Sequence, residues 1–151
     1  MSDKYFSRFI NRSDLQTDAM IFELRSSWWS RPYEYAWAAS FVEPGTTVLD
    51  AACGISHPLK FYLADHCANV YACDIDERII HPDSILREIA DDLGQEAAQC
   101  INPGYFDRIH FNQTNLGQLP HATGMFDMIF CISVLEHLDL TTLQAALHEF
   151  N

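Results

Sequence analysis

The sequence predicts an α/β domain built on a parallel sheet with helices on both faces. Short apolar runs alternate with segments of helical spacing after residue 44, and the dipeptide Pro44-Gly45 is a strong turn signal ahead of the first run. The chain has 151 residues, of which 48% are hydrophobic and 20% charged, as in an ordinary globular domain. Regular alternation of strand and helix predicts parallel strands, because each crossover helix returns the chain to the end of the sheet at which the previous strand began.

Residues 1–43 are expected to form an N-terminal helical cap, and residues 44–151 the sheet domain. Apolar residues at Leu15, Ala19 and Phe22, followed by two tryptophans, predict one helix. Ser30 and Pro32 predict the start of a second helix that runs to about residue 41. The segment WWSRPYEYAW holds all three tryptophans; packing of these aromatics in the core is favoured over an acceptor-binding lid, and both roles are compatible.

The elements of the sheet domain follow in order. Strands are expected over residues 46–50, 69–74, 108–113 and 126–132, where β-branched and apolar residues lie between turn signals. Helices are expected over residues 59–67 and 84–98, and another over residues 138–150, where apolar residues recur at helical spacing.

Composition excludes several classes of protein. The longest apolar run without charge, residues 128–135, is far shorter than a bilayer span, and the polar start has no signal-peptide core. The five cysteines are odd in number and contain no CxxC pair, so neither a disulfide scaffold nor a zinc ribbon is indicated. We therefore expect a soluble protein of the reducing cytoplasm.

The negative charge is concentrated in the sheet domain. Residues 1–40 carry five basic and five acidic side chains, so the net charge of −12 belongs to residues 41–151. This charge would repel a nucleic acid or an anionic membrane, and a small molecule is the expected partner.

Ligands bind an open parallel sheet at the carboxyl ends of its strands, so the residues after each strand are the most informative. The four ends read VLDAACGIS, VYACDID, FNQTNLGQLP and FDMIFCISVLEHL. In order and spacing they resemble the class I S-adenosylmethionine-dependent methyltransferases, especially the branch that modifies small molecules. The resemblance runs from about Thr47 to Phe150 and includes the family's junction of Leu-Pro with Phe-Asp, here Leu119-Pro120 and Phe126-Asp127.

The resemblance implies a binding site for S-adenosylmethionine. Asp50, Ala52 and Gly54 correspond to the acid and the glycine-rich loop that pass under the methionine part of the cofactor. Gly54 meets the need for close approach of the backbone to a ligand, because it has no Cβ. Ala52 and Ser56 replace the other two glycines that are usual in this loop.

The later strand ends supply the rest of the expected site. By resemblance, Asp74 accepts hydrogen bonds from both ribose hydroxyls and Ile75 packs on the adenine. Asn115 stands where an aspartate commonly receives the adenine amino group, and its carbonyl oxygen can still accept. The backbone N–H of Leu116 faces the ring, and Cys131 lies beside the methionine moiety.

No metal site and no catalytic residue are assigned from the sequence. Some relatives bind a divalent metal through a Glu-x-x-Glu-His pattern, but Ser133 stands at the first of those positions. Glu136 and His137 are instead expected to cap or brace the following helix. If the acceptor is a hydroxyl, His137, His57 or His121 could take its proton, and the sequence ranks none above the others.

The expected function is transfer of a methyl group to a small-molecule acceptor. A nicotinamide-binding domain would also place an acid about 20 residues after its glycine loop, but residues 52–57 do not match GxGxxG. A second alternative is a non-catalytic S-adenosylmethionine-binding or interaction protein on a degenerate methyltransferase fold, for which the two lost glycines and Asn115 are arguments. Measured cofactor binding separates these alternatives.

The family's sheet has seven strands, in which the order 3-2-1-4 continues with strands 5, 7 and 6. Only about four are expected here, so the sheet is truncated before strand 5 and its fourth strand becomes an apolar edge. Three explanations stay open: the chain is a fragment of a longer enzyme, the edge pairs in a homodimer or with another chain, or the N-terminal helices protect it.

Overall fold

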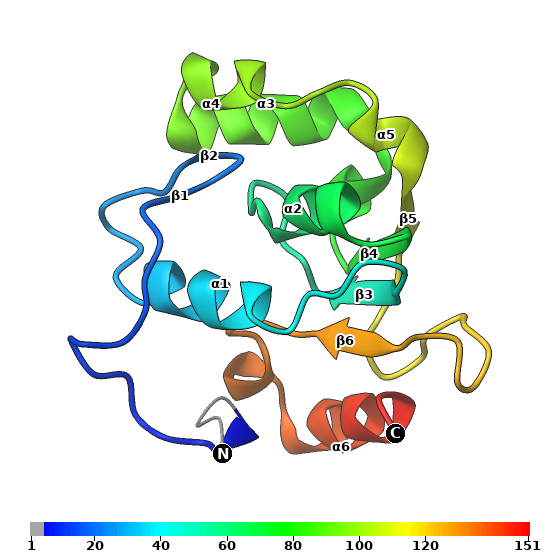
Figure 1. Ribbon diagram of the computed structural model, residues 1–151. Helices are drawn as coiled ribbons and strands as arrows, with labels where there is room; N and C mark the ends of the chain where they lie inside the picture. The colour runs from blue at the N-terminus through cyan, green and yellow to red at the C-terminus, as the bar shows by residue number, and fades with distance from the viewer. Residues whose placement is uncertain (1–4) are drawn as a thin grey trace.

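A four-stranded parallel sheet forms the centre of the computed structural model, which describes residues 5–151 (Figure 1). Its strands are β3 (Thr47–Ala51), β4 (Asn69–Asp74), β5 (Ile109–Gln113) and β6 (Met128–Phe130). They lie in the order β5-β4-β3-β6, and every pair is parallel. This is the predicted order 3-2-1-4, with the first strand in the interior of the sheet.

Helices cover both faces of the sheet, as the alternating pattern predicts (Figure 1). On one face lie α2 (Leu59–His66), α3 (Pro82–Leu93), α4 (Gln95–Gln99) and α5 (Tyr105–Arg108), and on the other lies α6 (Leu140–Glu149). Successive residues of a strand point to opposite faces. Accordingly Val48 belongs to the core beneath α2 and α3, whereas Leu49 and Ala51 belong to the core that includes Ala146 of α6.

The main differences from the predicted elements concern one helix, one strand and one additional short helix. The helix predicted over residues 84–98 begins at Pro82, which favours a first-turn position, and it divides at Gly94, whose φ of 99° is not helical. Strand β6 is shorter than the predicted span, and the short helix α5 precedes β5 without having been predicted.

The helix predicted over the segment from Leu15 to Trp29 is wrong. The structure has a small antiparallel hairpin there, β1 (Ala19–Met20) and β2 (Phe22–Glu23), with Ile21 at a φ of 68° in the turn. Met20 and Phe22 are buried in the core, two residues apart, whereas Leu15 is 75% exposed. Burial at this spacing suits extended backbone, so tertiary packing overrides the helical spacing of the sequence.

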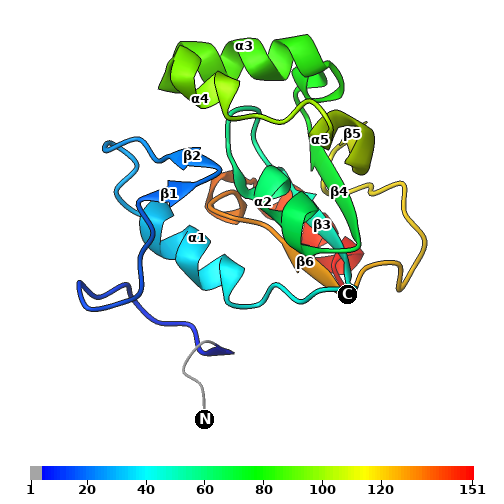
Figure 2. The same ribbon diagram turned by 45° about the horizontal axis from the view of Figure 1, so that its top comes forward.

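The second predicted helix is confirmed as α1 (Arg31–Ala39), which begins with Pro32 in its first turn. The expected packing of the tryptophans in the core is wrong for two of them, because Trp29 is 76% and Trp37 51% exposed. Tyr35 and Ala38 provide the buried face of this helix instead. Figure 2 shows α1 and the hairpin beside the sheet, next to the chain that follows β6.

Two aspartates fix the ends of elements near β6. The backbone N–H of Thr47 donates to Asp127 Oδ2 at 2.8 Å, so Asp127 ties the start of β6 to the start of β3. Asp139 accepts from the backbone N–H groups of Thr141 and Thr142 and caps α6. The cap expected from Glu136 or His137 is therefore provided by Asp139, while those two residues lie exposed in the 3-10 turn η3 (Leu135–His137). None of the helices in residues 5–151 has the length and apolar character to cross a bilayer.

Candidate functional site

A cavity of about 290 Å³ lies at the carboxyl ends of β3 and β4. This is the end of an open parallel sheet at which ligands bind. Five of the eight residues predicted for the cofactor site line it, namely Asp50, Ala52, Gly54, Asp74 and Ile75. The structure thus brings together the ends of the first two strands of the chain's sheet, although they are distant in sequence.

The other three predicted residues do not line this cavity. Asn115 is exposed, and its Oδ1 accepts from the backbone N–H of Gly117 at 2.9 Å. Leu116 is buried in the core on the α6 face of the sheet. Cys131 lines a separate, larger groove.

The loop after β3 has two residues with left-handed backbone. Ala52 has a φ of 52° and Gly54 a φ of 64°. A Cβ added to Gly54 would lie 2.4 Å from His57 Cδ2, so this position requires glycine. Alanine at position 52 adopts a conformation that costs an L residue about 1–2 kcal/mol, where the family usually has glycine.

The Asp74 carboxylate is held by backbone donors and still has capacity for a ligand. The N–H of Gly54 donates to its Oδ2 at 2.9 Å, and the N–H of Asp76 donates to its Oδ1 at 3.0 Å. A carboxylate has about four acceptor positions, so each oxygen can accept one more hydrogen bond from the cavity. Ile75, whose side chain is 68% exposed, offers an apolar surface beside it.

Asp50 is buried with one oxygen unsatisfied. Its exposed fraction is 2%, and Oδ2 has no hydrogen-bond partner. Burial raises the pKa of this carboxyl to about 7; the charge of Lys60 opposes the rise and that of Asp74 adds to it. An unsatisfied buried oxygen is destabilising. Because Asp50 lines the cavity, a bound ligand whose N–H or cationic group reaches this oxygen would satisfy it.

Lys60 is a fully buried cation behind the loop. Its Nζ donates to the carbonyl oxygens of Gly54 at 2.7 Å and His57 at 2.6 Å. These hydrogen bonds fix the loop from below and place the Lys60 ammonium near Asp50. Sequence reasoning missed this residue, because nothing distinguishes it from an ordinary exposed lysine of helix α2.

Of the three histidines considered as bases, His57 is the one that lines the cavity. Its Nδ1 lies 2.6 Å from the hydroxyl oxygen of Tyr35, and its ring stacks on Trp28 at 4.5 Å between centroids. Burial, assisted by the charges of Lys60 and Arg31, lowers the pKa of His57 to about 3. The ring is therefore neutral at pH 7.

The other two histidines lie away from the cavity. His121 packs against Tyr71 and Phe126, with its Nε2 buried and without a partner, and burial lowers its pKa. His137 is exposed in η3. No three His, Cys, Asp or Glu side chains are placed to hold a metal ion in the part of the chain that the structure describes.

Helix α1 contributes two lining residues that were not predicted, Arg31 and Tyr35. They are four residues apart and so share one face of the helix, which is the signal that could have paired them. Arg31 forms an ion pair with Glu34 on the same helix. Residues 132–134, after β6, complete the wall, and Ser133 there has a left-handed φ of 52°.

The sequence model of a family described as "Methyltransferase domain" matches residues 49–151. The chain belongs to the methyltransferase domain family. This match begins within β3, includes the other three strands of the sheet, and confirms the family that the strand ends predicted.

Solved structures of methyltransferases confirm the Rossmann-like fold. Magnesium protoporphyrin IX methyltransferase from Synechocystis PCC 6803, solved with bound S-adenosylhomocysteine, is 26% identical with a TM-score of 0.51, and the match covers 77% of this chain and 46% of that one. A TehB-like S-adenosylmethionine-dependent methyltransferase from Corynebacterium glutamicum, at 18% identity and a TM-score of 0.52, shares the fold over 77% of this chain and 53% of its own. This methyltransferase domain thus spans about half the length of those structures.

A curated relative from Synechococcus, an uncharacterized protein, is 34% identical over 94 residues. The match covers 61% of this methyltransferase chain and 19% of the relative.

Proposed function

We propose that this chain binds S-adenosylmethionine in the cavity at the ends of β3 and β4 and transfers its methyl group to a small-molecule acceptor. The observation that carries the proposal is the Asp74 carboxylate, which two backbone N–H groups hold in place while both oxygens keep room to accept. Membership of the methyltransferase domain family supports it. So do the structures of a 26% identical relative solved with S-adenosylmethionine and with S-adenosylhomocysteine.

The residues that line the cavity fit the chemical groups of this cofactor. A fixed carboxylate selects a vicinal diol, so Asp74 would hold the ribose, and Ile75 would pack on the adenine. The unsatisfied oxygen of Asp50 suits an ammonium, and the guanidinium of Arg31 suits a carboxylate. Together Asp50 and Arg31 offer opposite charges to the zwitterionic amino-acid end of the cofactor.

The chemistry asks little of the protein beyond position. The bound cofactor supplies an activated methyl group on a sulfonium, so the chain's own residues have to align the reactants and exclude water. Lys60 and Gly54 fix the loop, and the ring of His57, neutral and held near Tyr35, closes one side of the cavity.

Titration calorimetry with S-adenosylmethionine, S-adenosylhomocysteine and NAD tests the proposed cofactor. We expect the first two to bind and NAD not to bind; heat with NAD alone would overturn the proposal. Asp74→Asn should lower affinity about tenfold or more, because the hydrogen bonds to the ligand lose their charge assistance. Asp76→Asn is the matched control, since the Asp76 side chain pairs with Arg78 and its backbone N–H is unchanged.

Transfer of a labelled methyl group distinguishes the enzyme from a non-catalytic binding protein. The assay uses the cofactor and a panel of small apolar acceptors with the full chain. Transfer to an acceptor supports the enzyme, whereas cofactor binding without transfer to any acceptor in the panel favours the non-catalytic alternative. The cytoplasm is the proposed location, because the five cysteines are unpaired and suit a reducing compartment.

A further inference from the structure

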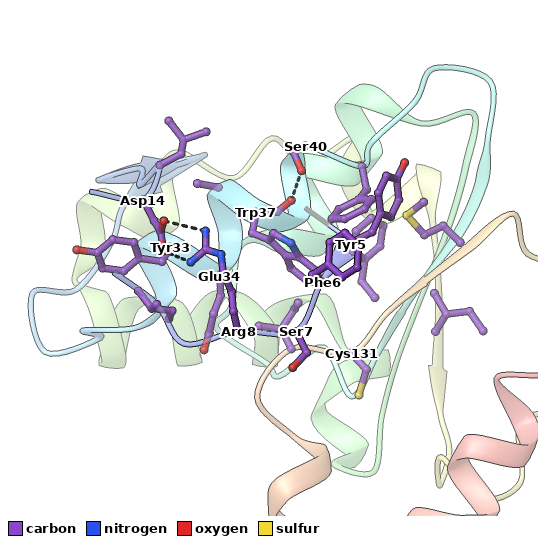
Figure 3. A pocket seen from close by; sticks show the side chains of 18 of the residues that line it. Tyr5, Phe6, Ser7, Arg8, Asp14, Tyr33, Glu34, Trp37, Ser40 and Cys131 are labelled. Atoms are coloured by element: carbon purple, nitrogen blue, oxygen red, sulfur yellow. Dashed lines mark hydrogen bonds and ion pairs between the residues drawn. The ribbon is translucent and has the colours of Figure 1, made fainter. Parts of the chain in front are cut away.

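A second and larger cavity, of about 990 Å³, lies between the N-terminal segment, helix α1 and strand β6. We call it the aromatic groove, because Tyr5, Phe6, Tyr33, Trp37 and Phe41 line one side of it. The opposite side is apolar and is built from β6 and the residues that follow it, including Phe130 and Ile132. In Figure 3 the labelled side chains of residues 5–8 and of α1 lie on one side of this space, with Cys131 facing them.

The aromatic groove and the cofactor cavity are neighbours that share a lining residue. Helix α1 separates the two, since Arg31 and Tyr35 line the cavity while Glu34 and Trp37 line the groove. Ile132 lines both. At this junction the hydroxyl of Ser133, which lines the cofactor cavity, donates to Glu34 Oε1 at 2.8 Å.

Glu34 is the charged group of the groove that stands at the junction. Its other carboxylate oxygen forms the ion pair with Arg31, which balances its charge. Among the described residues 5–151, the other charged residues that line the groove are Arg8 and Asp14, which pair with each other at 2.7 Å. The junction therefore offers a hydrogen-bond acceptor that carries little net charge, at the end of a largely apolar space.

We propose that the aromatic groove holds the methyl acceptor and that the acceptor is an apolar, aromatic-sized molecule whose neutral hydroxyl donates to Glu34. This inference rests on the proposed function, because it places the acceptor next to the proposed cofactor. A hydroxyl can donate a hydrogen bond to the Glu34 carboxylate, whereas an ionised carboxylate on the acceptor has no hydrogen to donate there. An ammonium gains little at Glu34, since Arg31 already neutralises that charge.

The same geometry gives Glu34 a catalytic role. The acceptor oxygen forms a bond to the methyl carbon as the carbon–sulfur bond breaks, and the electron pair of that bond stays on sulfur. The hydroxyl proton passes to the Glu34 carboxylate, because a newly methylated oxygen that still carries a proton is far more acidic than a carboxylic acid. Atoms and charge balance without any further reactant.

The test compares two probes built on the same ring system, naphthol and naphthoate, binding to the full chain saturated with S-adenosylhomocysteine at pH 7. Naphthol should bind about tenfold or more tightly than naphthoate, because only naphthol has a hydrogen to donate to the Glu34 carboxylate, whereas naphthoate would place acceptor oxygens against acceptor oxygens. Glu34→Gln should remove most of this preference, mainly by improving the binding of naphthoate. Glu43→Gln, which changes an exposed carboxylate outside the groove, is the matched control and should keep the preference.

The outcomes separate the two proposals. Binding of S-adenosylhomocysteine with no preference for naphthol, or with a preference that Glu34→Gln leaves intact, overturns this inference and leaves the proposed function standing. Failure of the wild-type chain to bind S-adenosylhomocysteine overturns the proposed function and this inference with it. Light scattering tests whether a second copy of the chain occupies the groove instead. A dimer whose formation excludes naphthol would assign the groove and the β6 edge to that second copy, and would also overturn the inference.

Discussion

The backbone N–H of Gly54 donates to the side chain of Asp74 at 2.9 Å, which joins the loop after β3 to the end of β4. The glycine that allows close approach and the acid proposed for the ribose are therefore one structural unit. A change in the shape of the loop displaces a donor to Asp74, so the two residues cannot be altered independently.

Gly54→Ala should lose both stability and cofactor affinity, because its Cβ would overlap His57 and its φ is left-handed. Ala52→Gly, two residues earlier, should keep the free energy of unfolding or raise it by up to about 1 kcal/mol. Glycine relieves the left-handed strain, but it also loses more backbone entropy than alanine when the chain folds. Thermal unfolding and calorimetry with S-adenosylhomocysteine measure both effects. Equal stability of Gly54→Ala and the parent would contradict the steric argument.

Asp74→Ala should weaken cofactor binding more than Asn115→Ala. Asp74 lines the cavity with a charged acceptor, whereas Asn115 is exposed and its oxygen is occupied by the N–H of Gly117. Asn115→Asp, which restores the residue usual in the family, should leave affinity unchanged or better. Calorimetry gives the ranking, and the reverse order of the two alanine variants would show that the ribose is held elsewhere.

Affinity for S-adenosylhomocysteine should rise as the pH increases from 6 to 8. Burial raises the pKa of Asp50 in the free protein to about 7. Because the ligand's ammonium favours the ionised carboxylate, binding below that pH requires Asp50 to lose its proton. Asp50→Asn should bind more weakly and without this dependence. Affinities measured at several pH values test it; a parallel pH profile for the variant and the parent would rule out Asp50 as the titrating group.

Asp50 and His57 should affect the pH dependence of stability in opposite directions. The folded-state pKa of Asp50 lies above its unfolded value, so it contributes more stability as the pH falls from 7 toward 4. The folded-state pKa of His57, about 3, lies below its unfolded value, so stability is lost as the pH falls from 6.5. At pH 5 the ring is neutral in the folded protein but protonated in the unfolded chain, so the free energy of unfolding is about 2 kcal/mol lower than above pH 6.5.

Two variants separate these contributions. Relative to the parent, Asp50→Asn should lose stability as the pH falls below 6.5, and His57→Gln should gain stability between pH 7 and 4. For each variant, the difference from the parent in the slope of unfolding free energy against pH should approach about 1.4 kcal/mol per pH unit, which corresponds to one proton bound or released on unfolding. Denaturant unfolding across the range measures the slopes, and equal slopes for both variants and the parent would refute the assignment.

The sheet could be predicted because its signals are local, and so could five of the residues that line the cavity proposed for the cofactor. Strands β3 and β4 are apolar runs that end in acids, and the ends of neighbouring parallel strands must meet. Local spacing failed before residue 30, where burial of Met20 and Phe22 favours a hairpin over a helix.

The rest of the site depends on contacts between distant segments. Lys60 is buried because loop carbonyls receive its ammonium, and His57 is neutral because Tyr35, Trp28 and buried surroundings enclose it. Neither environment has a signature in the residue's own neighbourhood. The junction of Glu34 with Ser133 likewise joins residues that are 99 positions apart.

Helix α1 is the common wall of the two cavities, which makes them thermodynamically linked. A ligand that shifts this helix, or breaks the hydrogen bond from Ser133 to Glu34, alters the free energy of filling the other space as well. Linkage requires the effect to be reciprocal: whatever factor the first occupant applies to the affinity of the second, the second applies to the first. One short helix therefore gives this fold a route to cooperative binding of the proposed cofactor and the proposed acceptor.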